Sequence, residues 1–161
     1  MSDFRQFQVS GLPGAPFAPL FAMSSEELER IGARRVVADA SFGFPCRVSL
    51  ADVPAGEELV LLAYEHQPAK GSPYRASGPI FVSRNATPSD LPPGELPTSV
   101  ARRLMSVRAY DAQHLIVDAE VCEGEALPPI IERMFADPQV AYLHLHNARR
   151  GCYACRVDRL A

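Results

Sequence analysis

YLHLHNARRGCYACR, residues 142–156, is the stretch that decides the fold, because it predicts two strands joined by a tight turn. Side chains alternate across a strand, so the even-numbered residues from Val140 to His146 share one face. The segment from Cys152 to Arg159 is typical of a returning strand. A turn over Arg149 and Arg150, or over residues 148–151, would join the two strands into an antiparallel hairpin.

Either turn decides which side chains of the hairpin meet. Position 147 then pairs with Cys152, Tyr153 lies opposite His146, and Cys155 lies opposite His144. Directly opposed residues point to the same side of a sheet. We therefore expect His144, His146, Tyr153 and Cys155 to converge on one face, with Cys152 on the other. A change of one residue in the loop would exchange these partners.

The rest of the chain supplies further strands and two short helices. Ser24 and Glu27 have the spacing of a capping box that starts a helix, and Gly32 would end it. Apolar residues recur at helical spacing over residues 128–136 and predict a second helix. Strands are predicted over residues 35–38, 59–66, 80–84, 103–109, 114–121, 140–147 and 152–159, with irregular segments at 11–19, 67–78 and 85–98. Residues 4–9 alternate weakly and would add a first strand. The pattern predicts an α+β fold: a mostly antiparallel sheet of about six to seven strands with two short helices packed on one side.

Length and composition predict one soluble domain over residues 1–161. The formal net charge is −3, which disfavours nucleic acid as a partner. No apolar run is long enough to span a bilayer, and the first residues lack the layout of a secretory signal. We therefore expect a cytoplasmic protein with no membrane partner, whose four cysteines are reduced thiols. Exposed edge strands would allow a homodimer.

The predicted hairpin carries residues that suit a metal or thiol site. His144, His146 and Cys155 would supply three ligands on one face and leave a fourth position for water, which is the usual layout of a catalytic zinc site. Cys155 beside His144 would also suit a Cys–His nucleophile pair. A structural zinc or a redox pair at Cys152 and Cys155 fits less well, because an extended C-x-x-C sends its thiols apart. The structural alternative is two satisfied histidines and a core cysteine.

A second candidate site would bind an anion. Residues 72–80, SPYRASGPI, lead into a predicted strand and include Tyr74, Arg75, Ser77 and Gly78. A guanidinium fork, hydroxyl groups and exposed backbone N–H groups would together cradle a phosphate or a carboxylate. The alternative is an ordered loop that Arg75 holds by pairing with a nearby carboxylate.

Other polar residues are candidates for either site. Cys46 and Cys152 are thiol candidates; Arg47 would lower the pKa of Cys46, and packing against its aromatic neighbours would raise it. His66 ends a buried-looking strand and Asp111 lies at a hairpin turn. Both would suit a polar site, and both would equally suit a simple edge or turn role.

Four runs of the sequence carry a resemblance to a known family. They are GFPCR at residues 43–47, SPYRASGPIFV at 72–82, the pair Tyr110-Asp111, and HLHNARRGCYACR at 144–156. With these runs the chain resembles, over nearly its whole length, a bacterial family known as domain of unknown function 1203. The resemblance implies recurring polar positions at Cys46, Arg47, Tyr74, Arg75, Ser77, Gly78, His144, His146, Asn147, Arg149, Gly151, Cys152 and Cys155. It implies a shared pocket rather than only a shared core, and no established activity, cofactor or substrate.

The leading hypothesis is a pocket that binds a small anionic molecule. Its expected ligand-binding residues are Arg47, Tyr74, Arg75, Ser77, Gly78, Asn147 and Arg149, with the hairpin histidines exchanging protons. One alternative is a zinc-binding or thiol-active enzyme built on His144, His146 and Cys155. The other is a non-catalytic interaction domain that uses the proline-rich residues 87–97. The sequence leaves open whether the protein is an enzyme.

Overall fold

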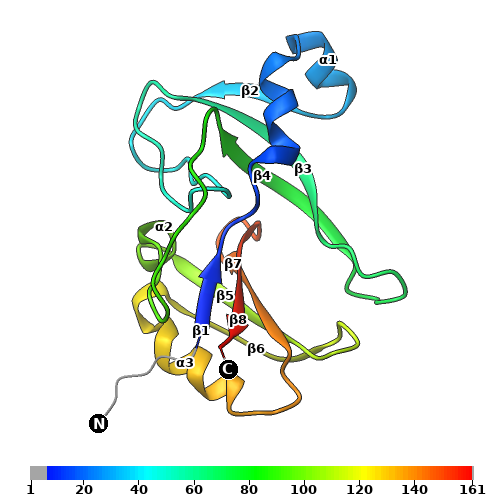
Figure 1. Ribbon diagram of the computed structural model, residues 1–161, viewed down its shortest axis with the longest axis vertical. Helices are drawn as coiled ribbons and strands as arrows, with labels where there is room; N and C mark the ends of the chain where they lie inside the picture. The colour runs from blue at the N-terminus through cyan, green and yellow to red at the C-terminus, as the bar shows by residue number, and fades with distance from the viewer. Residues whose placement is uncertain (1–6, 161) are drawn as a thin grey trace.

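The computed structural model describes residues 7–160 and contains two antiparallel sheets, of five and three strands, with short helices. The strands are β1 (Phe7–Ser10), β2 (Arg34–Val37), β3 (Glu58–Gln67), β4 (Ala76–Ser83), β5 (Leu104–Tyr110), β6 (Ile116–Glu123), β7 (Tyr142–Asn147) and β8 (Tyr153–Arg159). The helices are the 3-10 segments η1 (Ala15–Ala22) and η2 (Gly124–Ala126) and the α-helices α1 (Ser25–Arg30), α2 (Thr98–Ala101) and α3 (Leu127–Phe135). Figure 1 shows the sheets one above the other along the long axis of the molecule.

The larger sheet has the strand order β1-β8-β7-β5-β6 and packs one face against α3. Leu127, Ile131 and Met134 form the buried stripe of α3, as the helical spacing of apolar residues predicts. Leu143 and Leu145 of β7 belong to the same core cluster. Because side chains alternate, this packing turns the even-numbered residues of β7 to the opposite face of the sheet.

The smaller sheet has the order β2-β3-β4 and is covered by the N-terminal helices. Figure 1 shows η1 and α1 in the same half of the molecule as this sheet. Phe17 and Leu20 of η1 and Leu28 of α1 pack into its core. The predicted capping box is confirmed: the hydroxyl of Ser24 accepts a hydrogen bond from the backbone N–H of Glu27, whose carboxylate accepts one from the N–H of Ser24.

Segment 45–48 connects the two sheets. Cys46 forms a parallel bridge with Phe81 of β4, and the N–H of Arg47 donates to the carbonyl of Phe81 at 3.0 Å. The Arg47 side chain extends the other way, where its Nε donates to the carbonyl of Tyr153 in β8 at 2.7 Å. One residue therefore holds the edge of the small sheet to the large one.

The α+β class and the mostly antiparallel pairing are confirmed, while the strands divide between two sheets rather than forming one. The segments η1 and α2 were not predicted, because the prolines around them indicated loops. Of the expected first strand, residues 7–9 belong to β1, and residues 4–6 lie outside the described residues. The expectation of one domain stays a prediction. Within residues 7–160, no helix has the length and apolar character required to cross a membrane.

Gly124 provides a test of the packing at the junction of β6 and η2. A Cβ atom at this buried glycine would lie 2.0 Å from the carbonyl oxygen of Val100, so the backbone would have to shift. We expect Gly124→Ala to lower the free energy of unfolding by about 1–3 kcal/mol or more, as overpacking does. Gly78→Ala is the matched control, because its Cβ would meet open space in β4. Urea unfolding of the two variants checks the prediction, and equal stabilities would contradict the packing described.

Candidate functional site

A layer of aromatic and histidine rings lies where the two sheets meet. Tyr142, His144 and His146 of β7 project from the face of the large sheet that is turned away from α3, because Leu143 and Leu145 occupy the core face. Tyr110 of β5 pairs with Tyr142 in register, and Tyr153 of β8 pairs with His146. His144 and His146 are 4% and 1% exposed, so the ring layer is buried rather than open to solvent.

The expected position of Cys155 is wrong. Tyr153 lies opposite His146 as predicted, but Cys155 pairs with Leu145 and Arg156 pairs with His144. Ala154 is the extra residue of a β-bulge, which moves every later side chain of β8 to the other face. Cys155 is therefore 1% exposed in the core beside α3, and burial raises the pKa of its thiol to about 12. It shares no site with the histidines.

His66, from the smaller sheet, takes the place expected for Cys155. Its ring centroid lies 4.8 Å from that of His146 and 6.2 Å from that of His144, and the ring stacks on Tyr153. One nitrogen from each of the three histidines lies within 4.8 Å of the others. The sequence marked His66 as a polar candidate at a strand end, but only the packing of one sheet on the other brings it to the hairpin.

The three histidines are held in the neutral form. Burial, together with the neighbouring His146 and His66, lowers the pKa of His144 to about 3. Burial also lowers the pKa of His146 to about 4, against the opposing effect of the Gly151 carbonyl. Burial and the charge of Arg108 lower the pKa of His66. At neutral pH each ring therefore has one nitrogen with a free lone pair.

The hydrogen bonding of these rings is incomplete. Nδ1 of His146 lies 3.0 Å from the carbonyl oxygen of Gly151, which can only accept, so Nδ1 carries the proton and Nε2 the lone pair. Nη1 of Arg108 lies 3.5 Å from that Nε2. Among the described residues, Nδ1 of His66 and Nδ1 of His144 are buried and have no hydrogen-bond partner.

A second site lies next to this layer, where Arg47 donates to the carbonyl of Tyr153. Arg47, Arg102, Arg103, Arg149 and Arg150 line one cavity of about 520 Å³ together with Asn147 and Cys152. We call this cavity the arginine pocket. It lies between the 42–47 segment, the start of β5 and the β7–β8 turn, and Figure 1 shows that turn extending toward the smaller sheet.

Five arginines and one carboxylate, Glu123, line the arginine pocket, so its lining is positively charged overall. Arg103 forms a two-pronged ion pair with Asp52 at 2.6 and 3.0 Å. Arg102 lies over the ring of Phe42. Among residues 7–160, no carboxylate lies within ion-pair distance of the other lining arginines.

Arg47 is the buried member of the arginine pocket, with an exposure of 2%. Its guanidinium donates to the carbonyls of Tyr153 and Pro45 and, at 3.4 Å, to the Sγ of Cys152. Asn147 Nδ2 lies 3.6 Å from the same sulfur. Burial lowers the pKa of Arg47, which reflects the cost of a charge whose hydrogen-bond partners in the described part of the chain are neutral.

The other expected anion-binding residues lie elsewhere. Ser77 and Gly78 belong to strand β4, and Arg75 pairs with Glu65 at 3.3 Å on the exposed β3–β4 hairpin. Tyr74 packs near Tyr110, with ring centroids 6.4 Å apart. None of these four residues lines the arginine pocket. The structure therefore brings only some of the predicted anion-binding residues together: Arg47, Asn147 and Arg149.

Cys46 is separate from both sites, since it is 1% exposed in the core of the smaller sheet. Burial raises the pKa of its thiol, but hydrogen bonds from Ser49 and Ser83 outweigh this effect and lower the pKa below its usual value. The neighbouring guanidinium of Arg47 contacts Cys152 instead. Cys46 therefore has a structural position.

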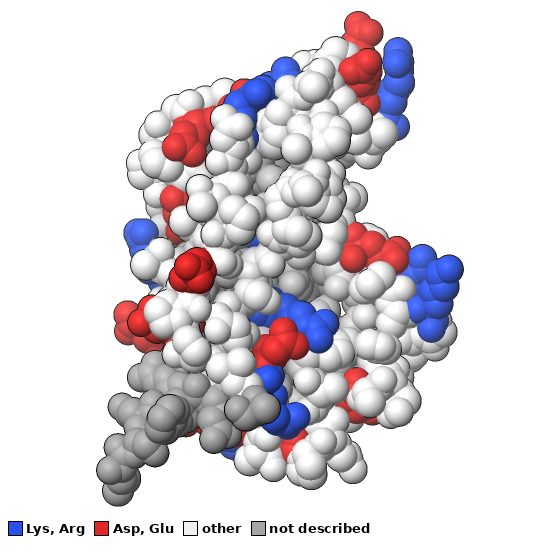
Figure 2. All heavy atoms as spheres, viewed as in Figure 1, with Lys and Arg blue, Asp and Glu red and all other residues white. Residues whose placement is uncertain are grey.

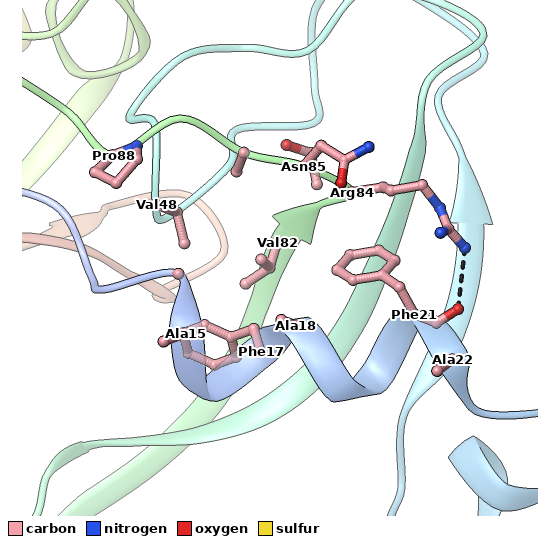
Figure 3. A pocket seen from close by; sticks show the side chains of 13 residues that line it. Ala15, Phe17, Ala18, Phe21, Ala22, Val48, Val82, Arg84, Asn85 and Pro88 are labelled. Carbon is pink, nitrogen blue, oxygen red and sulfur yellow. Dashed lines mark hydrogen bonds between the residues drawn. The ribbon is translucent and has the colours of Figure 1, made fainter.

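A further hollow of about 550 Å³ lies between η1 and the end of β4 (Figure 3). Its walls are mainly apolar, and Figure 3 shows Phe21 beside Arg84, whose guanidinium donates to the Phe21 carbonyl at 3.0 Å. Of the residues that the sequence predicts for a site, Pro88 of the proline-rich segment 87–97 lines this hollow, and none of the predicted anion-binding, metal or thiol residues does. On the face of the molecule drawn in Figure 2, acidic and basic groups are interspersed, so that face carries no broad patch of one charge.

Comparison with known proteins gives one match. A family model described as "Protein of unknown function (DUF1203)" matches residues 43–159, which include the three histidines and every arginine of the pocket. No curated protein and no solved structure matches the chain.

The neutral histidines predict a loss of stability in acid. An unfolded histidine binds a proton below a pH of about 6.5, whereas His146 and His144 stay neutral until about 4 and about 3. The unfolded state binds more protons in this window, so the free energy of unfolding should fall as the pH falls, by up to about 1.4 kcal/mol per pH unit for each ring. Urea unfolding of metal-free protein between pH 7 and pH 4 measures the slope. His144→Gln should flatten it, and identical slopes would contradict the assignment.

Proposed function

We propose that the chain, which belongs to the DUF1203 family, binds a small anionic molecule in the arginine pocket. The observation that carries the proposal is Arg47, whose buried guanidinium faces a cavity and whose hydrogen-bond partners within residues 7–160 are two carbonyls and a thiol. Burying a charge without a counter-charge is costly. A bound phosphate or carboxylate would supply the missing negative charge.

The lining of the pocket suits such a ligand. Guanidinium groups match the geometry of phosphate and carboxylate oxygens and bind them through paired hydrogen bonds. Arg47 is fixed in place by its two backbone acceptors, so little side-chain entropy is lost on binding. Arg149 and Arg150 lie exposed on the β7–β8 turn at the other side of the cavity. A fixed group and two adaptable ones would then hold one anion between them.

The size of the cavity favours a metabolite over a macromolecule. About 520 Å³ falls within the range of small-molecule sites. The rings of Phe42 and Phe81 are also part of the lining and would contact an apolar portion of the ligand. We therefore expect a compact molecule with one or two acidic groups. We infer a cytoplasmic location for the protein, because all four cysteines are free thiols and the cytosol keeps thiols reduced.

The interaction-domain alternative is less well supported. Leu91 and Leu96 of the proline-rich segment pack against the core of the larger sheet. The side chain of Gln8 donates to the carbonyl of Leu91, and Ser89 accepts from the N–H of Gly11. These contacts favour a structural connection over a loop that is free to bind a partner.

Arginine substitutions test where the anion binds. Arg149→Ala should weaken binding of phosphate, pyrophosphate or citrate about 10-fold to 100-fold, the loss expected for a hydrogen bond between charged groups. Arg75→Ala is the matched control, because Arg75 is an exposed arginine already paired with Glu65. Isothermal titration calorimetry measures both affinities. Loss of binding in Arg75→Ala alone, or no saturable binding of any of the three anions, would refute the proposal.

Cys152 provides an independent readout, because it is the one cysteine of the four that lines the arginine pocket. A bound anion should slow alkylation of Cys152 by a neutral reagent such as iodoacetamide. Cys122, which is also partly exposed, lies outside the pocket and should react at an unchanged rate. Peptide mass spectrometry after timed labelling gives both rates. Equal protection of the two thiols would indicate a general change in the protein rather than binding in the pocket.

A further inference from the structure

We infer that His66, His144 and His146 form a binding site for a divalent transition metal, with zinc as the expected ion. This site is separate from the arginine pocket and does not depend on the anion proposed there. None of its three ligands lines that pocket. It differs from the zinc site expected from the sequence because His66 replaces Cys155.

The three histidine rings lie close enough together to bind one ion. His144 and His146 are two positions apart on β7 and therefore point to the same side of the sheet. His66 approaches from the smaller sheet, and one nitrogen of each ring lies within 4.8 Å of the other two. Zinc bound at about 2.0–2.1 Å holds its ligands roughly 3.4 Å apart in a tetrahedral site. Small rotations of the imidazole rings would close the difference.

Two nitrogens of these rings have no hydrogen-bond partner among the described residues. Histidines that serve only as core residues normally satisfy their ring nitrogens, since a buried polar atom without a partner costs free energy. Nδ1 of His66 and Nδ1 of His144 have no partner among the described residues, and His144 is 4% exposed. His146 donates from Nδ1 to the Gly151 carbonyl, which is the outer-shell bond that commonly orients a metal-binding histidine. His66 and His144 thus each have a buried ring nitrogen without a partner among residues 7–160, and the lone pair of His146 faces only the long 3.5 Å contact from Arg108.

The chemistry of the ligands selects the metal. Three neutral imidazoles suit zinc, cobalt, nickel or copper, whereas calcium and magnesium require oxygen ligands. Three protein ligands leave a fourth position for water or another small ligand. Nη1 of Arg108 lies 3.5 Å from Nε2 of His146, against the lone pair that the metal would take, so the guanidinium must move aside when a metal binds. Its charge weakens binding of the bare cation and favours an anionic fourth ligand such as hydroxide.

Cobalt binding tests the inference in metal-free protein. The full chain should bind one equivalent of Co²⁺ with the visible absorption of a tetrahedral site, and Zn²⁺ should displace it. His66→Ala, His144→Ala and His146→Ala should each weaken binding at least about tenfold. Two variants are matched controls. His114→Asn changes the fourth histidine and introduces a residue that tolerates the positive φ of this position. Cys155→Ala removes the thiol that the sequence predicted as a ligand. Both controls should bind cobalt as the unmodified protein does.

Two further measurements complement the cobalt titration: X-ray absorption spectroscopy of bound zinc, and cobalt binding by an arginine-pocket variant. If an alanine variant fails to fold, X-ray absorption spectroscopy of zinc bound to the unmodified chain identifies the ligands directly. Nitrogen neighbours in number consistent with three imidazoles support the inference, and a sulfur neighbour overturns it. Retention of full cobalt affinity in His66→Ala, or no binding of cobalt by the unmodified chain, also overturns it. Arg149→Ala should bind cobalt normally, which separates failure of this inference from failure of the anion proposal.

Discussion

Arg47 is the residue on which the junction of the two sheets depends. Its backbone N–H bonds to β4 of the smaller sheet and its carbonyl accepts from Leu12, while its guanidinium bonds to the carbonyl of Tyr153 in the larger sheet. These bonds fix the distance between β4 and β8. The arginine pocket and the histidine cluster both require that distance, since each draws residues from both sheets.

The β-bulge at Ala154 decides which chemistry the hairpin presents. Without the extra residue, the thiol of Cys155 would join the histidines and Arg156 would enter the core. With it, the core receives a small apolar thiol beside α3, and the positively charged Arg156 lies on the same face as His144, where its guanidinium covers the ring of Tyr142. The bulge therefore gives the core an apolar side chain at position 155 and leaves a cluster in which every candidate metal ligand is a histidine nitrogen.

Local chemistry was readable from the sequence. The capping box at Ser24, the apolar stripe of α3 and the alternation along β7 each depend on neighbours a few residues apart, and each is present in the structure. The resemblance to the family is confirmed over residues 43–159.

Features that depend on distant contacts were not readable. A bulge changes the register without a clear signal in the alternation of β8, so Cys155 was placed on the wrong face. The meeting of His66 with the hairpin requires the packing of one sheet on the other, and the meeting of Arg102 and Arg103 with Arg149 requires the pairing of β5 with β7. The residue pattern of a single segment carries no information about such long-range contacts.

The pairing of β1 with β8 has a consequence for how the chain is made. Phe7 lies in register with Arg159, so the strand synthesised first finds its partner only when nearly all of the described chain has been translated. The smaller sheet, by contrast, pairs strands that follow one another along the chain and can close while synthesis continues. Co-translational folding should therefore begin with the smaller sheet, and β1 should remain accessible to chaperones and proteases until the ribosome has released the C-terminal hairpin.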